Sequence, residues 1–93
     1  MNGLLIRTNG NTELLSFKNV NVLEKLQELV GGYIECLELG NGKMLVVDED
    51  GKFKYKEYND VASNIYVLMT RTSDYIVGDA ILCESSLLEW VNS

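Results

Sequence analysis

The 93-residue sequence contains no histidine and no proline, and it has only two cysteines. Histidine is the commonest general base and the commonest neutral metal ligand in proteins. Without it, no serine or cysteine has a partner that could activate it as a nucleophile, which leaves carboxylates, lysine and tyrosine for most chemistry. We therefore expect a protein that is not an enzyme, with no cofactor and no bound metal.

Positive charge is also scarce. The sequence has 8 Lys and Arg residues against 14 Asp and Glu residues, a formal net charge of −6. A surface that neutralises DNA phosphates needs an excess of basic side chains, so we expect no direct nucleic-acid binding. No run approaches the roughly 18 apolar residues of a membrane span, and the N-terminus does not resemble a signal peptide. We expect a cytoplasmic protein that does not enter a membrane.

The two cysteines, Cys36 and Cys83, both fall within predicted strands. In a cytoplasmic protein this placement is typical of buried free thiols. A disulfide or a zinc site would require a different compartment and more ligands.

The hydrophobic pattern predicts one α+β domain over residues 1–93. Apolar residues spaced by three and four predict a helix over residues 21–30, which ends at two glycines. A second helix over residues 60–71 is capped by Asn59 or Asp60. Strands are predicted at residues 3–8, 12–17, 33–39, 43–48 and 75–84. We expect a mostly antiparallel sheet of about five strands, with the two longer helices on one face and a short C-terminal helix.

A two-residue turn at Asn41 and Gly42 predicts the register of the central hairpin. In that register Leu39 faces Met44, Leu37 faces Val46 and Glu35 faces Asp48. Both faces of the hairpin are then largely apolar, and a chain of this length has little left to cover them. We therefore expect a homo-oligomer.

Three acidic residues of this hairpin and its following turn form the nearest approach to a carboxylate site: Glu35, Asp48 and Asp50. Three carboxylates could hold a hard cation, but the D-x-D-G segment lacks the spaced ligands and the closing Glu of a calcium loop. Repulsion between the facing acids could equally be relieved by Lys52 or Lys54. We expect no metal there.

Residues 52–57, KFKYKE, alternate lysine with aromatic side chains and predict a short strand or an extended connection. Aromatic rings beside cations could stack on a nucleotide and neutralise it, although the same alternation is typical of an edge strand with a solvated lysine face. The N-terminus of the second helix could receive a phosphate, or Asn59 could be an ordinary helix cap. The candidate ligand-binding residues are Lys54, Tyr55, Lys56, Tyr58, Asn59 and Arg71.

Three segments, LQELVGGYIECLEL, VVDEDGKFKYKEYNDVA and DYIVGDAILC, occur in this order. Together they resemble an uncharacterised family of small bacteriophage and bacterial proteins, the domain of unknown function numbered 3846, over about residues 20–84. The chain departs from the family pattern at Asp48, where Asn is usual, and at Asp60, where Arg usually follows the Asn. The missing Arg removes a cation from the start of the second helix.

The resemblance implies a phage or mobile-element setting, and hence the cytoplasm of a host cell. It supplies no activity, substrate or catalytic residue. Our first hypothesis is a non-catalytic binding protein that counters host defence, either by sequestering a nucleotide-derived signal or by occupying a host protein. The alternatives are an acidic mimic of nucleic acid that inhibits a DNA-binding enzyme, and a small carboxylate or metal-dependent enzyme that uses Glu35 and Asp48.

Overall fold

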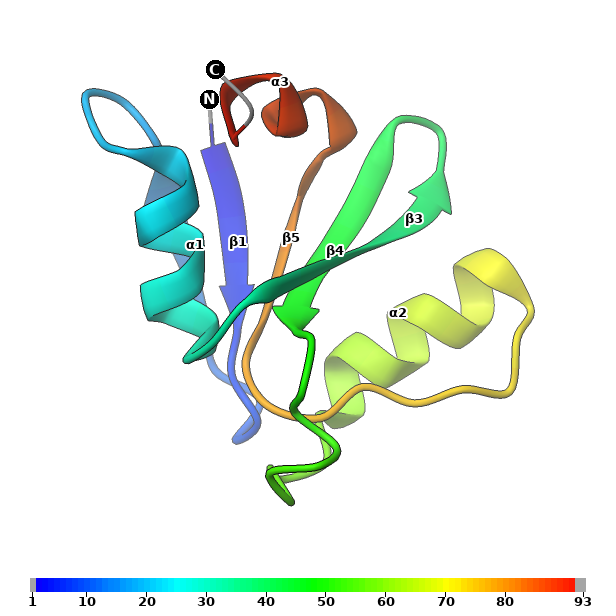
Figure 1. The fold of residues 1–93 in the computed structure, drawn as a ribbon. Helices are drawn as coiled ribbons and strands as arrows, with labels where there is room; N and C mark the ends of the chain where they lie inside the picture. The colour runs from blue at the N-terminus through cyan, green and yellow to red at the C-terminus, as the bar shows by residue number, and fades with distance from the viewer. Residues whose placement is uncertain (1, 92–93) are drawn as a thin grey trace.

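The computed structural model describes residues 2–91, which form one five-stranded antiparallel sheet with helices on both of its faces (Figure 1). The elements follow the order β1 (Asn2–Ile6), β2 (Thr12–Ser16), α1 (Val22–Val30), β3 (Ile34–Gly40), β4 (Lys43–Asp48), α2 (Asp60–Thr70), β5 (Ala80–Glu84), a 3₁₀ turn (Ser85–Leu87) and α3 (Leu88–Val91). The strands lie in the order β2-β1-β5-β4-β3. The predicted α+β class and five-stranded antiparallel sheet are confirmed.

Local signals determine both ends of α1. The Asn21 side chain accepts a hydrogen bond from the backbone N–H of Glu24 and caps the first turn. Gly31 ends the helix in the left-handed conformation, at φ 80°, where a Cβ would be disfavoured. Both features were predicted from the sequence, because a cap and a glycine stop depend only on neighbouring residues.

The prediction that both longer helices lie on one face is wrong. Every residue of β4 from Met44 to Asp48 is buried, so both faces of the sheet need cover. On one face α1 and α3 pack on Leu5, Met44 and Ile81. On the other face α2 packs on the alternate residues of the same strands, including Ile6, Leu45 and Ala80. Figure 1 shows the two helices on opposite sides of the sheet.

The predicted register of the central hairpin is correct only at its turn. Gly40 pairs with Lys43 around Asn41 and Gly42, but the register then shifts by one residue between Glu38 and Gly40. This bulge places Glu35 opposite Val47 and Ile34 opposite Asp48. Because neighbouring strand residues point to opposite faces, Glu35 and Asp48 lie on different sides of the sheet and do not pair.

The last strand is shorter than predicted. Only residues 80–84 form β5, in the centre of the sheet between β1 and β4. Before it, Gly78 takes a left-handed φ of 75°, and the Asp79 carboxylate accepts the backbone N–H of Thr8 at 3.0 Å. The segment 74–78 therefore leaves the sheet and runs beside α2, where Val77 pairs with Tyr58.

In the described part of the chain, no helix combines the length and apolar character that crossing a membrane would require.

Candidate functional site

The turn segment, residues 49–58, connects β4 to α2 and extends from the lower end of the sheet in Figure 1. It is neither a strand nor an extended connection. Hydrogen bonds from Lys54 N–H to Asp50 O and from Lys56 N–H to Gly51 O close it into successive turns. Tyr55 adopts a left-handed φ of 56°, which is uncommon for a residue with a side chain. This conformation breaks the alternation that the sequence predicted for the segment.

Two lysines of the turn segment converge on one buried carboxylate. The Asp48 side chain is only 1% exposed, and its Oδ2 lies 2.9 Å from Lys54 Nζ and 2.7 Å from Lys56 Nζ. Its other oxygen accepts the backbone N–H of Asp50 at 2.9 Å. Burial alone would raise the pKa of Asp48, but these three hydrogen bonds outweigh it and lower the pKa to about 2. Asp48 is therefore a charged anchor for the turn segment.

The same two ammonium groups bind the end of α1. Lys54 Nζ donates to the Gly31 carbonyl at 3.2 Å and Lys56 Nζ to the Val30 carbonyl at 2.5 Å. The last carbonyls of a helix have no partner within the helix and carry partial negative charge, so lysine stabilises them. A Cβ added at Gly32 would lie 2.7 Å from both the Asp48 carboxylate and Lys54 Nζ, so the closely packed arrangement requires glycine.

The third lysine of the turn segment is also held. Lys52 Nζ lies 2.6 Å from Asp74 Oδ1 and 4.2 Å from the centre of the Tyr75 ring. The hydrogen bond from Lys52 lowers the pKa of Asp74, with a smaller contribution from the Tyr75 backbone N–H. Tyr75 in turn lies beside Tyr58, with ring centres 6.1 Å apart. These contacts join the turn segment to the strand-like segment that precedes β5.

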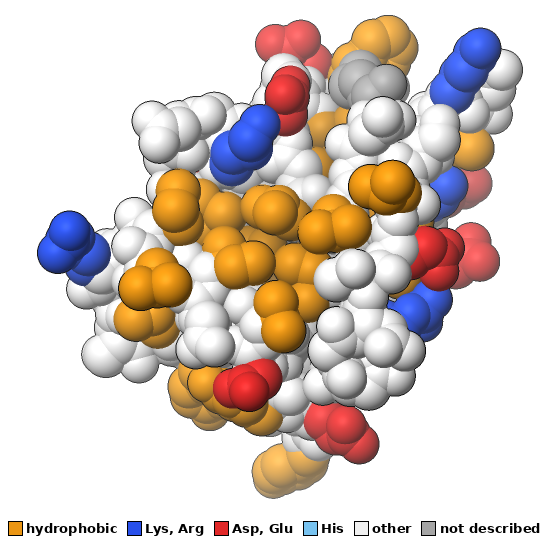
Figure 2. All heavy atoms as spheres, turned by 180° about the vertical axis from the view of Figure 1, so that it is seen from behind, with side chains coloured by type: hydrophobic (Ala, Val, Ile, Leu, Met, Phe, Trp, Pro, Cys, Tyr) orange, Lys and Arg blue, Asp and Glu red, His pale blue; other side chains and the backbone are white. Residues whose placement is uncertain are grey.

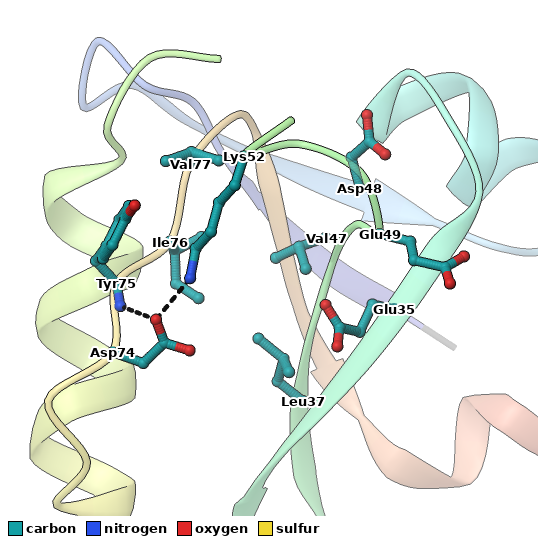
Figure 3. A pocket seen from close by; sticks show the side chains of 10 residues that line it. All are labelled: Glu35, Leu37, Val47, Asp48, Glu49, Lys52, Asp74, Tyr75, Ile76 and Val77. Carbon is teal, nitrogen blue, oxygen red and sulfur yellow. Dashed lines mark hydrogen bonds and ion pairs between the residues drawn. The ribbon is translucent and has the colours of Figure 1, made fainter. Parts of the chain in front are cut away.

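A cavity of about 180 Å³ opens beside this ion pair, between the end of the β3–β4 hairpin and residues 74–77. Figure 3 shows Glu35 and Leu37 on one wall and Lys52, Asp74 and Tyr75 on the other, while the Asp48 carboxylate points away. Within residues 2–91, Glu35 takes part in no ion pair. No three His, Cys, Asp or Glu residues of that range form a group that could hold a metal.

Two aromatic residues of the turn segment, Phe53 and Tyr55, are almost entirely in solvent. Phe53 is 84% exposed and Tyr55 is 93% exposed. Tyr33, in the connection between α1 and β3, is 71% exposed. The Tyr33 carbonyl accepts the backbone N–H of Glu49, which places Tyr33 beside the start of the turn segment. The sequence left two interpretations open, a face that stacks on a nucleotide and an edge strand with a solvated lysine face. In the structure each of the three lysines pairs with a carboxylate of the chain, and the rings of Phe53 and Tyr55 are in solvent.

The remaining candidate ligand-binding residues do not converge. Asn59 is fully buried: its amide donates to the carbonyls of Ile6 and Gly78, both at 2.9 Å, and its oxygen accepts Ala62 N–H at 3.0 Å. It is a helix cap that also ties α2 to the sheet. Arg71 ends α2, and the 11 residues of that helix separate it from Asn59 by about 16 Å.

Several acidic side chains of the turn segment and its neighbours form no ion pair in the described chain. Within the described chain, five carboxylates at this end of the molecule take part in no ion pair: Glu35, Glu49, Asp50, Glu57 and Asp60. Asp50, by contrast with the prediction of an acidic cluster, contributes its backbone N–H rather than its carboxylate to Asp48. The three predicted acids are therefore separated: one is buried by lysines, one faces the cavity and one lies on the surface.

Sequence reasoning missed the roles of Tyr33, Asp74 and Tyr75. No local pattern marks these residues, because their contacts with the turn segment join parts of the chain that are more than 15 residues apart. The one available signal was the alternation of three lysines with aromatic residues, which placed the lysines on one side of the segment. It did not reveal the partners of the lysines.

A family model described as Domain of unknown function (DUF3846) matches residues 1–87. Comparisons with curated proteins and with solved structures gave no significant match.

Proposed function

The chain belongs to the DUF3846 family, and we propose that it is a small non-catalytic binding protein whose turn segment docks on a basic surface of another protein. The main support for this proposal is that the lysines of residues 52–56 form ion pairs within the chain, whereas the aromatic rings between them are exposed. Lys52, Lys54 and Lys56 all have internal partners, whereas Phe53 and Tyr55 are almost fully exposed.

Two exposed aromatic rings on a turn whose backbone is fixed by ion pairs are well suited to anchor a partner. Burying one such side chain contributes about 2 kcal/mol from the apolar area alone. Aromatic residues are enriched at interfaces, and hot spots often contain Tyr. The contacts of Lys54 and Lys56 with Asp48 and α1 already order the backbone, so little conformational entropy remains to be lost on binding.

The surrounding charge indicates the chemistry of the partner. The carboxylates of Glu49, Asp50 and Glu57 belong to the turn segment itself, and none of them forms an ion pair within residues 2–91. Arginine or lysine on a partner could pair with these acids and also lie over the rings of Phe53 and Tyr55. Opposite charge would also speed the encounter at low salt. A surface rich in Arg and Lys fits this end of the molecule best.

The structure offers less support for nucleotide sequestration. The lysines that would neutralise a phosphate already bind Asp48, and the fully buried Asn59 amide donates both of its hydrogens within the chain. We therefore favour a host protein as the target. The resemblance to phage proteins leads us to place this encounter in the cytoplasm of a bacterial host and to propose that it counters host defence.

An acidic mimic of nucleic acid is the second candidate, and the five carboxylates without cations favour it. The two candidates differ in the part played by the rings. A mimic would bind through charge alone, so its affinity would fall steeply with salt and would not depend on Phe53 or Tyr55.

The experiment uses three forms of the chain to capture proteins from a bacterial lysate: the wild type, the double variant Phe53→Ser/Tyr55→Ser, and Leu68→Ser. Quantitative mass spectrometry then compares the captured proteins. Leu68 is 78% exposed on α2 and provides a matched control for the loss of exposed apolar area. We expect one basic protein whose capture survives Leu68→Ser. The double variant should lower the affinity by at least about 30-fold, since the loss of even one buried ring costs about 2 kcal/mol.

Equal capture by the double variant and the wild type would refute the docking role of the rings. If that capture were also abolished by moderate salt, the acidic mimic would replace the first proposal.

A further inference from the structure

β2 is an edge strand, so within residues 2–91 its outer side faces no other strand. The turn that joins it to β1 is closed by a hydrogen bond from Arg7 N–H to Asn11 O. Hydrogen-bonded and non-hydrogen-bonded pairs alternate along an antiparallel ladder. The backbone groups of Glu13 and Leu15 therefore point to β1, and those of the alternate residues point outward: Thr12, Leu14 and Ser16. The Ser16 carbonyl confirms this direction, because it accepts Lys25 Nζ at 2.8 Å.

On the face away from α1, β2 presents the apolar side chain of Leu14 between Thr12 and Ser16. Leu14 is 82% exposed and lies opposite Leu4, which lies opposite Leu82 in the next strand. The three leucines line a shallow groove of about 270 Å³. Figure 2 shows this side of the molecule, with hydrophobic side chains gathered across its middle. We call the surface formed by Leu4, Leu14 and Leu82 the leucine row.

We infer that a second copy of this chain pairs with β2 in antiparallel orientation about a two-fold axis at Leu14. In this register Leu14 faces Leu14 of the second copy, and Thr12 faces Ser16. The outward N–H and carbonyl groups of these residues meet their counterparts, and two five-stranded sheets become one. The leucine rows of the two copies then join into one continuous row across the axis.

Charge complementarity favours a second copy as the occupant. Glu13 faces Leu15 of the other copy rather than a second carboxylate, so no like charges meet directly. Lys25 is held at Ser16, the residue that faces Thr12 of the other copy, and on the same side of the sheet as Glu13. Glu13 already pairs with Arg7 of its own copy at 3.1 Å, and each copy brings Lys25 as a second cation near this carboxylate of the other copy. Symmetry repeats the contact.

An exposed edge with a large apolar side chain is otherwise a liability for a monomer, because it templates uncontrolled strand pairing. β2 contains no lysine or proline to prevent such pairing. A closed two-fold pairing satisfies this edge and leaves β3 as the edge strand of each copy. It uses no residue of the turn segment, so each dimer would present two turn segments.

Sedimentation equilibrium on the purified chain tests the inference, with Leu14→Lys and the matched control Leu68→Lys. Both leucines are largely exposed, at 82% and 78%, so both variants should retain the far-ultraviolet circular dichroism of the wild type. We expect twice the chain mass of 10.5 kDa for the wild type and for Leu68→Lys, and a single chain for Leu14→Lys. A wild-type monomer at millimolar concentration, or a Leu14→Lys dimer, would overturn it.

A cysteine in place of Leu14 tests the register itself. Facing Cα atoms in a hydrogen-bonded antiparallel pair are about 5.5 Å apart, within the range of a disulfide. Mild oxidation should link Leu14→Cys into a covalent dimer and leave the matched control Leu68→Cys as single chains. Equal linkage of both variants, or linkage of neither, would contradict the proposed axis.

Discussion

The two longer helices cover the two faces of the sheet in different ways. α1 buries Val22, Leu26 and Val30 in the larger of the two apolar cores. α2 buries only Ala62 and Ser63, and several of its apolar side chains are exposed, including Leu68 and Met69. Polar anchors hold α2 in its place: Asn59 bonds to two carbonyls of other segments, and Ser63 bonds to the backbone of Ile76.

This difference shows how a short chain can cover one face fully and leave the other partly open. An amphipathic helix is held by buried area, which is not directional. A helix that buries little area needs directional bonds with buried partners, because leaving those partners unpaired would be costly. The face under α2 therefore keeps the leucine row at one end, with Leu14 exposed and Leu4 and Leu82 half-buried, whereas α1 buries its apolar side chains against the other face.

The largest expected effect is at the centre of the closed face. Leu26 is fully buried in the core beneath α1, and Leu26→Ala should lower the free energy of unfolding by about 3 kcal/mol, through lost burial and the cavity left behind. Chemical denaturation at neutral pH measures this change. Leu68→Ala on α2 is the matched control and should change it by less than about 0.5 kcal/mol. Similar losses for the two variants would contradict the contrast between the helices.

Asn59→Ala tests the polar attachment of α2. The change removes the helix cap and leaves the Ile6 and Gly78 carbonyls without their donor, at an expected cost of about 2–3 kcal/mol. Amide hydrogen exchange should show loss of protection in residues 60–70 before α1 is affected. Equal loss of protection in both helices would mean that α2 is not held separately.

The Asp48 anchor predicts an acid-dependent loss of stability. Its pKa in the folded protein is about 2, below the ordinary value near 4, so the folded state gains stability above pH 4. That contribution, about 2 kcal/mol, should be lost as the pH falls from about 5 to 2. Urea denaturation at a series of pH values measures it. Asp48→Asn should be less stable at pH 7 and should lack this part of the pH dependence; an unchanged acid profile would exclude the anchor.

Ser63→Ala should have the smallest effect of the four. Its hydroxyl accepts Ile76 N–H at 2.8 Å and lies 3.2 Å from the Ile76 carbonyl, so the variant leaves one buried N–H without a partner. We expect a loss of about 1 kcal/mol, measured by thermal unfolding. Ser63→Cys, which keeps a weak donor and acceptor of similar shape, should recover part of this loss. If neither variant changes stability, Asn59 alone holds α2.

Features that depend on adjacent residues were predictable from the sequence. The cap at Asn21, the glycine stop at Gly31 and the Asn41 turn all appear where the sequence places them. The register away from that turn was not predictable, because a bulge of one residue between Glu38 and Gly40 shifts the pairing of residues 34–38, the part of β3 that precedes it. The choice of face for α2 depends on Asn59 reaching Ile6, which is 53 positions earlier in the chain.

The candidate site illustrates the same limit. The sequence indicated residues 52–57 as a candidate binding segment, but the alternation of lysine and aromatic residues does not reveal which side chains pair within the chain and which stay in solvent. That depends on Asp48 being buried at the end of α1, and on Asp74 meeting Lys52 from a distant segment.

The most direct test of the docking role is an amide chemical-shift titration of the ¹⁵N-labelled chain with a nine-residue arginine peptide at physiological salt. The largest shifts should fall in residues 49–58 and at Tyr33, and Phe53→Ser/Tyr55→Ser should reduce them. Glu24 and Glu28 on α1 provide an acidic control surface without the exposed rings. Equal shifts at α1, or shifts at the turn segment that the double variant leaves unchanged, would contradict the proposal that the rings of Phe53 and Tyr55 anchor a basic partner.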